Sequence, residues 1–461
     1  MSTFKTITPV DNSVYLEMDY HDENDINTTL EVAKKAQKYW RQVPIEEKIE
    51  LLNKFVDALG KKSEEISKEL AYQMGRPISY GTLEIRGFKE RANYMIEIAK
   101  DALSPYYLEP KKGFERSIIK EPLGVVAVLS PWNYPFLTSV NVIVPALLAG
   151  NSVILRHSTQ TPLVAKRYQE AFDEAGLPKG VFSHLYLTHK DASNFMADSR
   201  VDGVYFTGSV KGGLEVQKAI SDKFIPCGLE LGGKDPAYVM EDADIKYSAE
   251  NLVDGSFFNS GQSCCGIERI YVHEKVYDEF IDEFVRITKE YKLGNPLNKD
   301  TTIGPMVKTQ AATFVRGQIK EALNKGAKAL VDESMFANSK ANTPYLGPTV
   351  LVDVDHSMSV MKEESFGPVV GIMKVKDDKE ALKLMNDSDL GLTASLWTKD
   401  IQKAYDLAPL IETGTVYTNR CDYLDPTLAW TGVKNTGRGV TLSKYGYDHV
   451  TRVKSLHFKK I

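Results

Sequence analysis

The chain has 461 residues, 43% of them hydrophobic and 26% charged, which is the composition of an ordinary globular protein long enough for more than one domain. Its formal net charge of −5 argues against a nucleic-acid-binding surface. Four cysteines in this length do not form a disulfide framework, no apolar run reaches ~20 residues, and the acidic N-terminal stretch lacks a signal-peptide pattern. We therefore expect a cytoplasmic protein with no membrane span and no nucleic-acid partner, and we identify no metal site.

The first hundred residues have the apolar spacing of helices. Residues 27–29 (Asn-Thr-Thr) are predicted to cap a helix that runs through Tyr39, and residues 45–59 repeat apolar side chains every three or four positions. After Gly124 the pattern changes to short apolar runs. These runs predict strands at 125–129, 152–155 and 202–206, with a helical segment around 145–149. Such alternation is typical of a doubly wound parallel sheet.

A second alternating α/β region follows Gly233. Its predicted strands lie near 269–272, 349–352, 369–375 and 393–397. Two segments fit neither region, namely 104–121 and the tail after Leu442.

Residues 257–265 give the clearest indication of a catalytic site, because Cys264 follows a Gly-Gln pair there. A thiol is a good nucleophile only as the thiolate, and a stretch of Asn, Gly, Gln and Ser can supply polarity and backbone amides. A lone cysteine is more often a buried and inert side chain. Two upstream motifs favour a reactive one: residues 130–135 supply the amide of Asn133, and residues 229–234 supply the carboxylate of Glu230.

With these motifs the chain resembles the aldehyde dehydrogenase superfamily over nearly its whole length, although the resemblance does not extend to one substrate class. The matching pieces, in order, are PWNYP (131–135), FTGS (206–209), LELGGK (229–234), FFNSGQSC (257–264), LGNP (293–296), IGPM (303–306), EESFGP (363–368) and GTVYTN (414–419).

The resemblance implies an α/β fold with three parts. These are a Rossmann-like dinucleotide-binding domain (1–103 and 122–232), an α/β catalytic domain (233–441) and a small oligomerisation β-extension (104–121 and 442–461). In the family, the equivalents of the extension pair as strands that lengthen a neighbouring subunit's sheet, which implies a homodimer or homotetramer.

The resemblance also assigns the catalytic roles. Cys264 attacks a small-molecule aldehyde, while Asn133 and the Cys264 backbone N–H stabilise the resulting oxyanion. Hydride passes to the nicotinamide, and Glu230 then activates water to hydrolyse the thioester. The apolar neighbours of Glu230 predict a raised pKa. Lys234 is expected to order Glu230 or Asn133, and Cys265 to be a structural neighbour that points away from the cleft.

The cofactor site lacks the usual GxGxxG fingerprint. Residues 206–213 nevertheless lie between a predicted strand and helix, where free amides at a helix N-terminus attract a pyrophosphate. A glycine-rich loop that only turns the chain, and a Phe366 that belongs to the core, are the alternatives. The resemblance favours a cofactor role for Trp132, Gly208, Ser209, Gly213, Leu231, Glu364 and Phe366.

The adenosine-ribose segment departs from the family. Where members commonly carry Lys-Pro-Ser-Glu, this chain has Arg156, His157, Ser158 and Thr159. The missing carboxylate removes repulsion toward a 2′-phosphate, and an arginine fork suits phosphate oxygens. Two interpretations stay open: use of NADP beside NAD, or an Arg156 that only replaces lysine on the ribose while NAD is preferred.

The sequence says less about which residues bind the aldehyde substrate. Tyr134, Phe257, Phe258, Ser263 and the loop 420–425 are expected to surround the aldehyde entrance, and Trp430 stands in an unusual place for the family. Arg420 either binds a distal carboxylate, as in a semialdehyde substrate, or pairs with Asp422 or Asp425 on a solvated loop. Two further functions remain as alternatives: a CoA-acylating dehydrogenase, which Glu230 argues against, and a catalytically retired binding protein.

Overall fold

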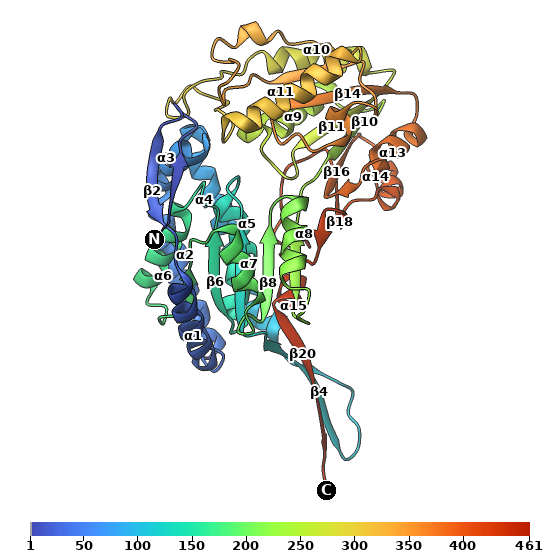
Figure 1. Ribbon diagram of the computed structural model, residues 1–461. Coiled ribbons are helices and arrows are strands. Elements are labelled where there is room, and N and C mark those ends of the chain that lie inside the picture. The colour runs from blue at the N-terminus through green and yellow to red at the C-terminus, as the bar shows by residue number, and fades with distance from the viewer. Residues whose placement is uncertain (1) are drawn as a thin grey trace.

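Two largely parallel sheets build the two halves of the chain in the computed structural model, which describes residues 2–461 (Figure 1). The first sheet has six strands in the order β19-β9-β8-β5-β6-β7. Its strands are β5 (Val125–Ser130), β6 (Ser152–His157), β7 (Phe182–His184), β8 (Gly203–Thr207), β9 (Cys227–Glu230) and β19 (Gly437–Arg438). Only β19 runs antiparallel to its neighbour, so the predicted α/β class is confirmed.

The central strand β5 shows why this sheet is parallel and covered. All six of its residues are buried, which requires helices on both faces. The predicted strands at 125–129, 152–155 and 202–206 agree with β5, β6 and β8 to within two residues. The helices that follow these strands are α5 (Pro135–Leu148), α6 (Leu163–Ala175), α7 (His189–Ala197) and α8 (Val210–Ala219). Helix α5 begins ten residues before the predicted segment, at a proline in its first turn.

Four helices precede the first sheet: α1 (Glu23–Trp40), α2 (Ile45–Gly60), α3 (Ser63–Met74) and α4 (Ile78–Leu103). The predicted cap at 27–29 is wrong. Asp22 caps α1 instead, because its carboxylate accepts from the Asp25 N–H and Asp25 accepts in return, both at 3.0 Å. At the other end of α1, buried Trp40 donates from Nε1 to the Leu147 carbonyl at 2.8 Å, which fixes α1 to α5.

The second sheet has seven strands in the order β12-β13-β14-β11-β10-β16-β17. Its strands are β10 (Asp235–Val239), β11 (Ile267–His273), β12 (Lys328–Ala329), β13 (Thr349–Val352), β14 (Val369–Val375), β16 (Thr393–Trp397) and β17 (Thr415–Thr418). The strands predicted at 349–352, 369–375 and 393–397 match β13, β14 and β16, and the one at 269–272 lies inside β11. The larger helices here are α9 (Ile245–Phe257), α10 (Tyr277–Thr288), α11 (Thr309–Asn324), α13 (Asp378–Asn386) and α14 (Ile401–Leu407).

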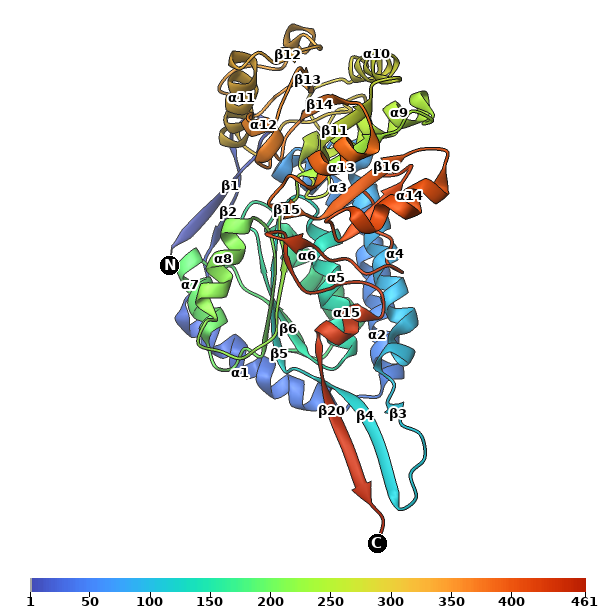
Figure 2. The same ribbon diagram turned by 90° about the vertical axis from the view of Figure 1, so that its right-hand side faces the viewer.

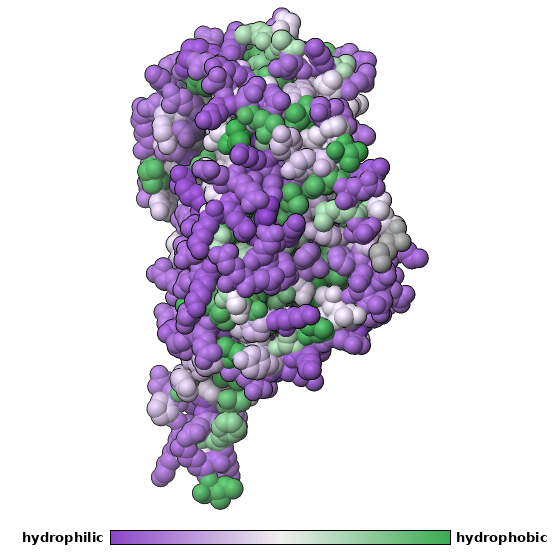
Figure 3. Space-filling model, turned by 90° about the vertical axis from the view of Figure 1, so that its left-hand side faces the viewer, coloured by the Kyte–Doolittle hydropathy of each residue, from purple (hydrophilic) through white to green (hydrophobic). Residues whose placement is uncertain are grey.

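A long ribbon projects from the body, as Figures 1 and 2 show. It pairs β4 (Phe114–Pro122) with β20 (Thr451–Lys459) in antiparallel register, with β3 (Tyr106–Tyr107) at its edge and α15 (Tyr445–His449) before β20. Val453 and Phe458 are 73% and 57% exposed on it. Figure 3 shows this ribbon at the bottom, with apolar side chains among hydrophilic ones. No helix within residues 2–461 is long and apolar enough to cross a bilayer.

Candidate active site

A cavity of about 310 Å³ brings together side chains from both halves of the chain. Helices α4 and α5 form one wall, and the loops that follow α9 and β17 form the other. Cys264 and Glu230, which the sequence predicted as partners, both line it. So do Tyr134, Phe258 and Ser263 of the expected entrance, whereas Phe257 is fully buried in the core of the second half.

The loop before Cys264 has an unusual backbone. Asn259, Ser260 and Gly261 have φ values of 52°, 59° and 68°, so three consecutive residues are left-handed. This conformation is unfavourable for asparagine and serine, and the surroundings must hold it. Ser260 is buried and donates from Oγ to the Gly304 carbonyl at 2.8 Å.

Arg76 ties this loop to the segment that carries Asn133. Its Nε donates to Asn259 Oδ1 at 3.2 Å and its Nη2 donates to the Asn133 carbonyl at 2.5 Å, while Nη1 pairs with Glu84. The Asn133 side-chain amide donates to the Gln262 carbonyl at 3.2 Å. The predicted oxyanion donor and the predicted nucleophile therefore lie on two loops held by one buried guanidinium.

Glu230 ends strand β9 at the cavity wall. Thr441 donates from Oγ1 to Glu230 Oε1 at 2.5 Å, and Thr207 donates to Oε2 at 3.3 Å. Burial raises the pKa of Glu230 above its ordinary value, although these hydroxyls oppose the shift. A carboxylate with a raised pKa is suited to take a proton from water near neutral pH.

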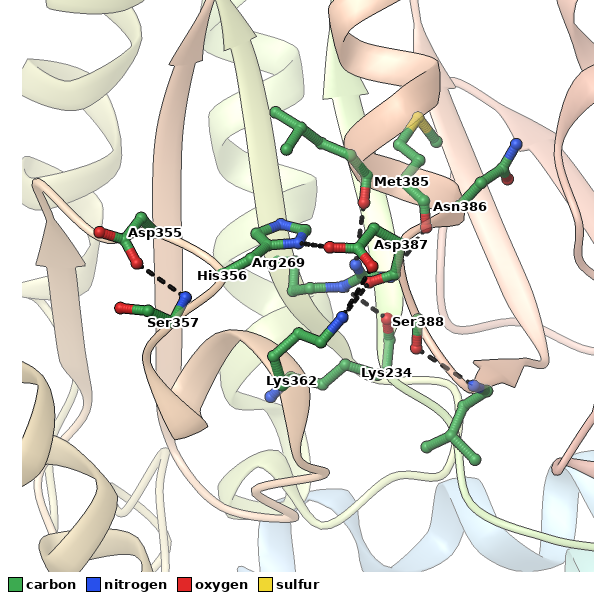
Figure 4. A network of polar contacts seen from close by, with 12 residues as sticks. Lys234, Arg269, Asp355, His356, Ser357, Lys362, Met385, Asn386, Asp387 and Ser388 are labelled. Atoms are coloured by element: carbon green, nitrogen blue, oxygen red, sulfur yellow. Dashed lines mark hydrogen bonds and ion pairs between the residues drawn. The ribbon is translucent and has the colours of Figure 1, made fainter.

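Lys234 does not contact Glu230 or Asn133, so that expectation is wrong. Its ammonium donates to Glu268 at 2.5 Å and to Ser365 Oγ at 3.2 Å, because β10 directs the side chain toward the 363–368 segment. Buried Arg269 fixes the Lys234 backbone, donating from Nε to its carbonyl at 2.9 Å and from Nη2 to the Met385 carbonyl at 3.1 Å (Figure 4). Lys234 thus supports the 363–368 segment rather than Glu230.

Cys265 also differs from its prediction, because it lines the cavity beside Cys264. Its thiol donates to Asp422 Oδ1 at 3.0 Å, and Ser263 donates to the same oxygen at 2.7 Å. Contact with the Cys264 thiol and burial hold the pKa of Cys265 well above its usual range. Cys265 is therefore a poor thiolate, which leaves Cys264 as the better candidate nucleophile.

Of the two predicted alternatives for Arg420, pairing with Asp422 or Asp425 is wrong. Arg420 is exposed, does not line the cavity, and stacks on Tyr423 with the guanidinium carbon 3.4 Å from the ring centroid. Within residues 2–461 it forms no ion pair with Asp422 or Asp425. Trp430 is buried and lines the cavity.

The predicted pyrophosphate turn lies between β8 and α8. Ser209 caps α8 by accepting from the Gly212 N–H at 3.1 Å, so the helix begins directly after the turn that follows β8. A Cβ on Gly213 would lie 2.7 Å from Leu231 Cδ1, so a larger residue there would have to displace the Leu231 side chain. At Gly208 the obstacle would be the Phe206 ring, at 2.5 Å.

The predicted nicotinamide end is assembled from separate segments. The rings of Trp132 and Phe366 meet edge-to-face with centroids 5.7 Å apart. Glu364 accepts from the Gly233 N–H at 3.1 Å, and burial, followed by the charge of Glu268, raises its pKa to about 8.

The predicted adenosine end centres on Arg156 at the end of β6. Its Nη2 donates to the Leu187 carbonyl at 3.3 Å, while its buried Nε has no acceptor among the described residues. Ser158 accepts from the Gln160 N–H, and the Thr159 carbonyl accepts from Thr6 at 2.8 Å. These residues follow the carboxyl end of a parallel strand, the edge at which such sheets bind a dinucleotide, so their position fits one.

The fold and site together define an α/β dinucleotide-dependent oxidoreductase. Residues 1–456 match the aldehyde dehydrogenase family, so the chain belongs to the aldehyde dehydrogenase family. It is 32% identical to an aldehyde dehydrogenase of Paenarthrobacter nicotinovorans, with 98% of each chain covered. It is 30% identical to the succinate semialdehyde dehydrogenase [NAD(P)+] Sad of Escherichia coli, covering 98% of this chain and 99% of that one.

Comparison with a solved structure also supports this family. Succinic semialdehyde dehydrogenase from Streptococcus pyogenes, in complex with NADP+, superposes with a TM-score of 0.94 at 28% identity, covering 99% of this chain and 100% of that chain. The chain is therefore an oxidoreductase that acts on aldehydes, and its cofactor is NAD or NADP.

Several residues around the cavity were missed by the sequence. Thr441 has no local signal, because it meets Glu230 only through the tertiary fold. Asp422 belongs to the loop expected at the entrance, but its contacts with Ser263 and Cys265 were not predicted. The sequence around Arg76 gave only a weak indication that this residue is structurally important. It stands between Gly75, which ends α3 with φ 84°, and Pro77, which precedes α4, so it occupies a tight helix-to-helix connection.

Proposed function

We propose that this protein oxidises an aldehyde to its carboxylate with NAD or NADP through a covalent thioester on Cys264, and that Glu230 is the base for its hydrolysis. The observation that carries this proposal is the shared cavity of Cys264 and Glu230, together with the raised pKa of Glu230.

In the first step the Cys264 sulfur attacks the aldehyde carbon, and negative charge develops on the aldehyde oxygen. The Asn133 side chain has two N–H groups, one of which donates to Gln262, and the other is the proposed oxyanion donor beside the Cys264 N–H. Arg76 keeps the two donors in register because it bonds both loops. When bound, NAD(P)+ supplies the hydride acceptor that this oxidation needs.

In the second step Glu230 removes a proton from water, whose oxygen attacks the thioester carbon and releases the carboxylic acid and the Cys264 thiol. Thr441 and Thr207 hold the Glu230 carboxylate in place for this proton transfer. The proposed cofactor contacts are Ser209 and Arg156 at the phosphate and ribose end.

The remaining proposed contacts lie at the nicotinamide end and along the cleft. They comprise Trp132, Leu231, Glu364 and Phe366, with Gly208 and Gly213 giving the backbone room for close approach and Ser158 and Thr159 lining the adenosine side.

Single-turnover kinetics of Glu230→Gln test this proposal. The variant should release about one equivalent of reduced cofactor per active site and then stall, with an acyl adduct on Cys264 visible by intact mass. Cys264→Ala is the matched control and should give neither the burst nor the adduct. Unchanged steady-state turnover in Glu230→Gln would refute the role of the base, and an acyl-CoA product formed only when CoA is added would favour the acylating alternative.

The ribbon of β4 and β20 is the proposed oligomerisation segment, which would join copies of the chain into a homodimer or homotetramer. Its exposed Val453 and Phe458 are the apolar contacts expected at such an interface. Light scattering on the purified protein measures the assembly directly, and a monomer at micromolar concentration would contradict this role.

A further inference from the structure

Arg91 enters the cavity from helix α4. One turn earlier, Gly87 lets α4 approach α5 closely, since a Cβ there would lie 2.7 Å from Leu137 Cδ2. The guanidinium is fixed on that side only: Nη1 donates to the Leu137 carbonyl at 2.6 Å and to Asn141 Oδ1 at 3.3 Å. The Arg91 side chain therefore crosses the interface between α4 and α5 and lines the cavity that contains Cys264.

The opposite edge of the guanidinium is unused. Within residues 2–461, Arg91 Nε and Nη2 have no acceptor and no carboxylate lies within ion-pair distance, although the residue is only 8% exposed. An Nε–Nη2 edge is a planar fork that matches the two oxygens of a carboxylate. A buried cation without a counter-ion is costly, and arginine cannot escape the cost by losing its proton.

The other charges around the cavity do not supply the missing anion. Glu84 is the strongest negative charge that acts on Arg91, but its two oxygens are taken by Arg76 and by the backbone N–H groups of Phe136 and Leu137. Glu230 accepts from Thr441 and Thr207, Asp422 accepts from Ser263 and Cys265, and neither carboxylate forms an ion pair with Arg91 within residues 2–461. Glu90 lies exposed and accepts from the Tyr423 hydroxyl at 2.8 Å.

Asp254 and Arg86 are exposed as well. Arg91 is therefore the buried charge of this cavity that still needs a partner of opposite sign.

We infer that Arg91 binds a carboxylate at the far end of the substrate, so that the preferred substrates are short aldehydes with a terminal carboxylate. This inference rests on the proposed aldehyde oxidation at Cys264. The cavity of about 310 Å³ is at the small end of ligand sites, which agrees with a short chain between the two functional groups. Two of the similar proteins named above act on succinic semialdehyde, which makes that compound a suitable probe.

Two other roles make different predictions. If Arg91 instead stabilised the Cys264 thiolate, its loss would slow every aldehyde equally. If Asp422 instead bound a substrate ammonium group, an amino aldehyde would be preferred. Asp422 already accepts hydrogen bonds from Ser263 and Cys265, whereas Arg91 bonds only through Nη1 and keeps its charge, so the carboxylate is favoured.

The test compares kcat/KM for succinic semialdehyde, butanal and 4-aminobutanal, which share four carbons. The native protein should prefer succinic semialdehyde. Arg91→Met should lower the ratio of kcat/KM for succinic semialdehyde over butanal by about 30-fold or more, because a buried charge pair is lost. Arg91→Lys should recover part of the ratio. Arg286→Met, which removes a guanidinium paired with Glu283 and Glu290 on the surface of α10 and outside the cavity, is the matched control and should leave the ratio unchanged.

An equal loss on both aldehydes in Arg91→Met, or a native preference for butanal or 4-aminobutanal, would overturn the inference. Binding of non-reacting acids gives a second measurement that does not need turnover. Succinate should raise the thermal midpoint of the native protein more than butyrate does, and Arg91→Met and Arg91→Lys should reduce the difference.

The two proposals fail separately. If no aldehyde is oxidised but succinate still binds through Arg91, the proposed reaction is wrong and the anion site stands. If butanal is oxidised and succinate gives no shift beyond that of butyrate, the reaction stands and the carboxylate assignment is wrong.

Discussion

Replacing Arg76 by methionine should damage both stability and catalysis. Glu84 is 1% exposed and accepts from Arg76 and from the backbone N–H groups of Phe136 and Leu137 at 2.9 and 3.0 Å. Arg76→Met leaves this carboxylate buried without its counter-ion, a change that costs about 3–5 kcal/mol. Arg76→Met together with Glu84→Gln removes both charges, so the double variant should be less destabilised than the sum of the singles by about 2 kcal/mol.

The same change should loosen the two loops that carry Asn133 and Cys264. Arg76→Met removes the donors to the Asn133 carbonyl and to Asn259, and displacement of reacting groups by about 1 Å can reduce rate by about 100-fold. We therefore expect kcat to fall by about 10- to 100-fold in protein that remains folded.

Urea unfolding followed by circular dichroism, with kcat measured on the same samples, provides both quantities. Lys54→Met is the matched control, because Lys54 pairs with Glu50 on the exposed face of α2 and should cost less than about 0.5 kcal/mol. A cost below about 1 kcal/mol for Arg76→Met, with strictly additive effects in the double variant, would refute a buried and structurally required ion pair.

Cys264→Ala should reduce activity by about 10³-fold or more, while Cys265→Ala keeps most of it; activity assays that give the reverse order would reassign the nucleophile. Thioester hydrolysis should decline as pH falls through the raised pKa of Glu230, because only the deprotonated carboxylate accepts a proton, so the steady-state rate should drop in acid while the burst persists in stopped-flow traces. NADP should be used within about 10-fold of NAD, which is about 1.4 kcal/mol of discrimination. Thr159→Glu should weaken NADP far more than NAD, and Arg156→Ala should also harm NADP more; strict NAD use that is insensitive to Thr159→Glu would show that another residue governs the 2′ position.

Local sequence patterns predicted the sheets well and the helix starts less well. Strands such as β5 and β13 are short, fully buried and mostly apolar runs, and such runs are bounded clearly in a sequence. The start of α1 was misplaced because Asp22 and the segment 27–29 both carry side chains that can cap a helix. Only the structure shows which of them meets a free N–H.

The site was predictable where a motif carries the chemistry in neighbouring residues. Cys264 and Glu230 stand in such motifs, and the fold brings them to one cavity. The partner of Lys234 and the unused edge of Arg91 depend on contacts between distant segments. Neither follows from spacing, because a side chain's direction across a helix seam or beyond a strand end is set by packing.

The three left-handed residues before Cys264 have a consequence for how the protein loses activity. A backbone that is unfavourable by itself persists only while Arg76 and Gly304 hold it, so this loop should be among the first segments to open when the molecule is perturbed. Heat or mild urea should then abolish turnover before either sheet melts. Amide hydrogen exchange should find residues 259–261 far less protected than β5, although both lie in the interior. The enzyme would have an inactive yet folded form, from which cooling or dilution restores activity without refolding the chain.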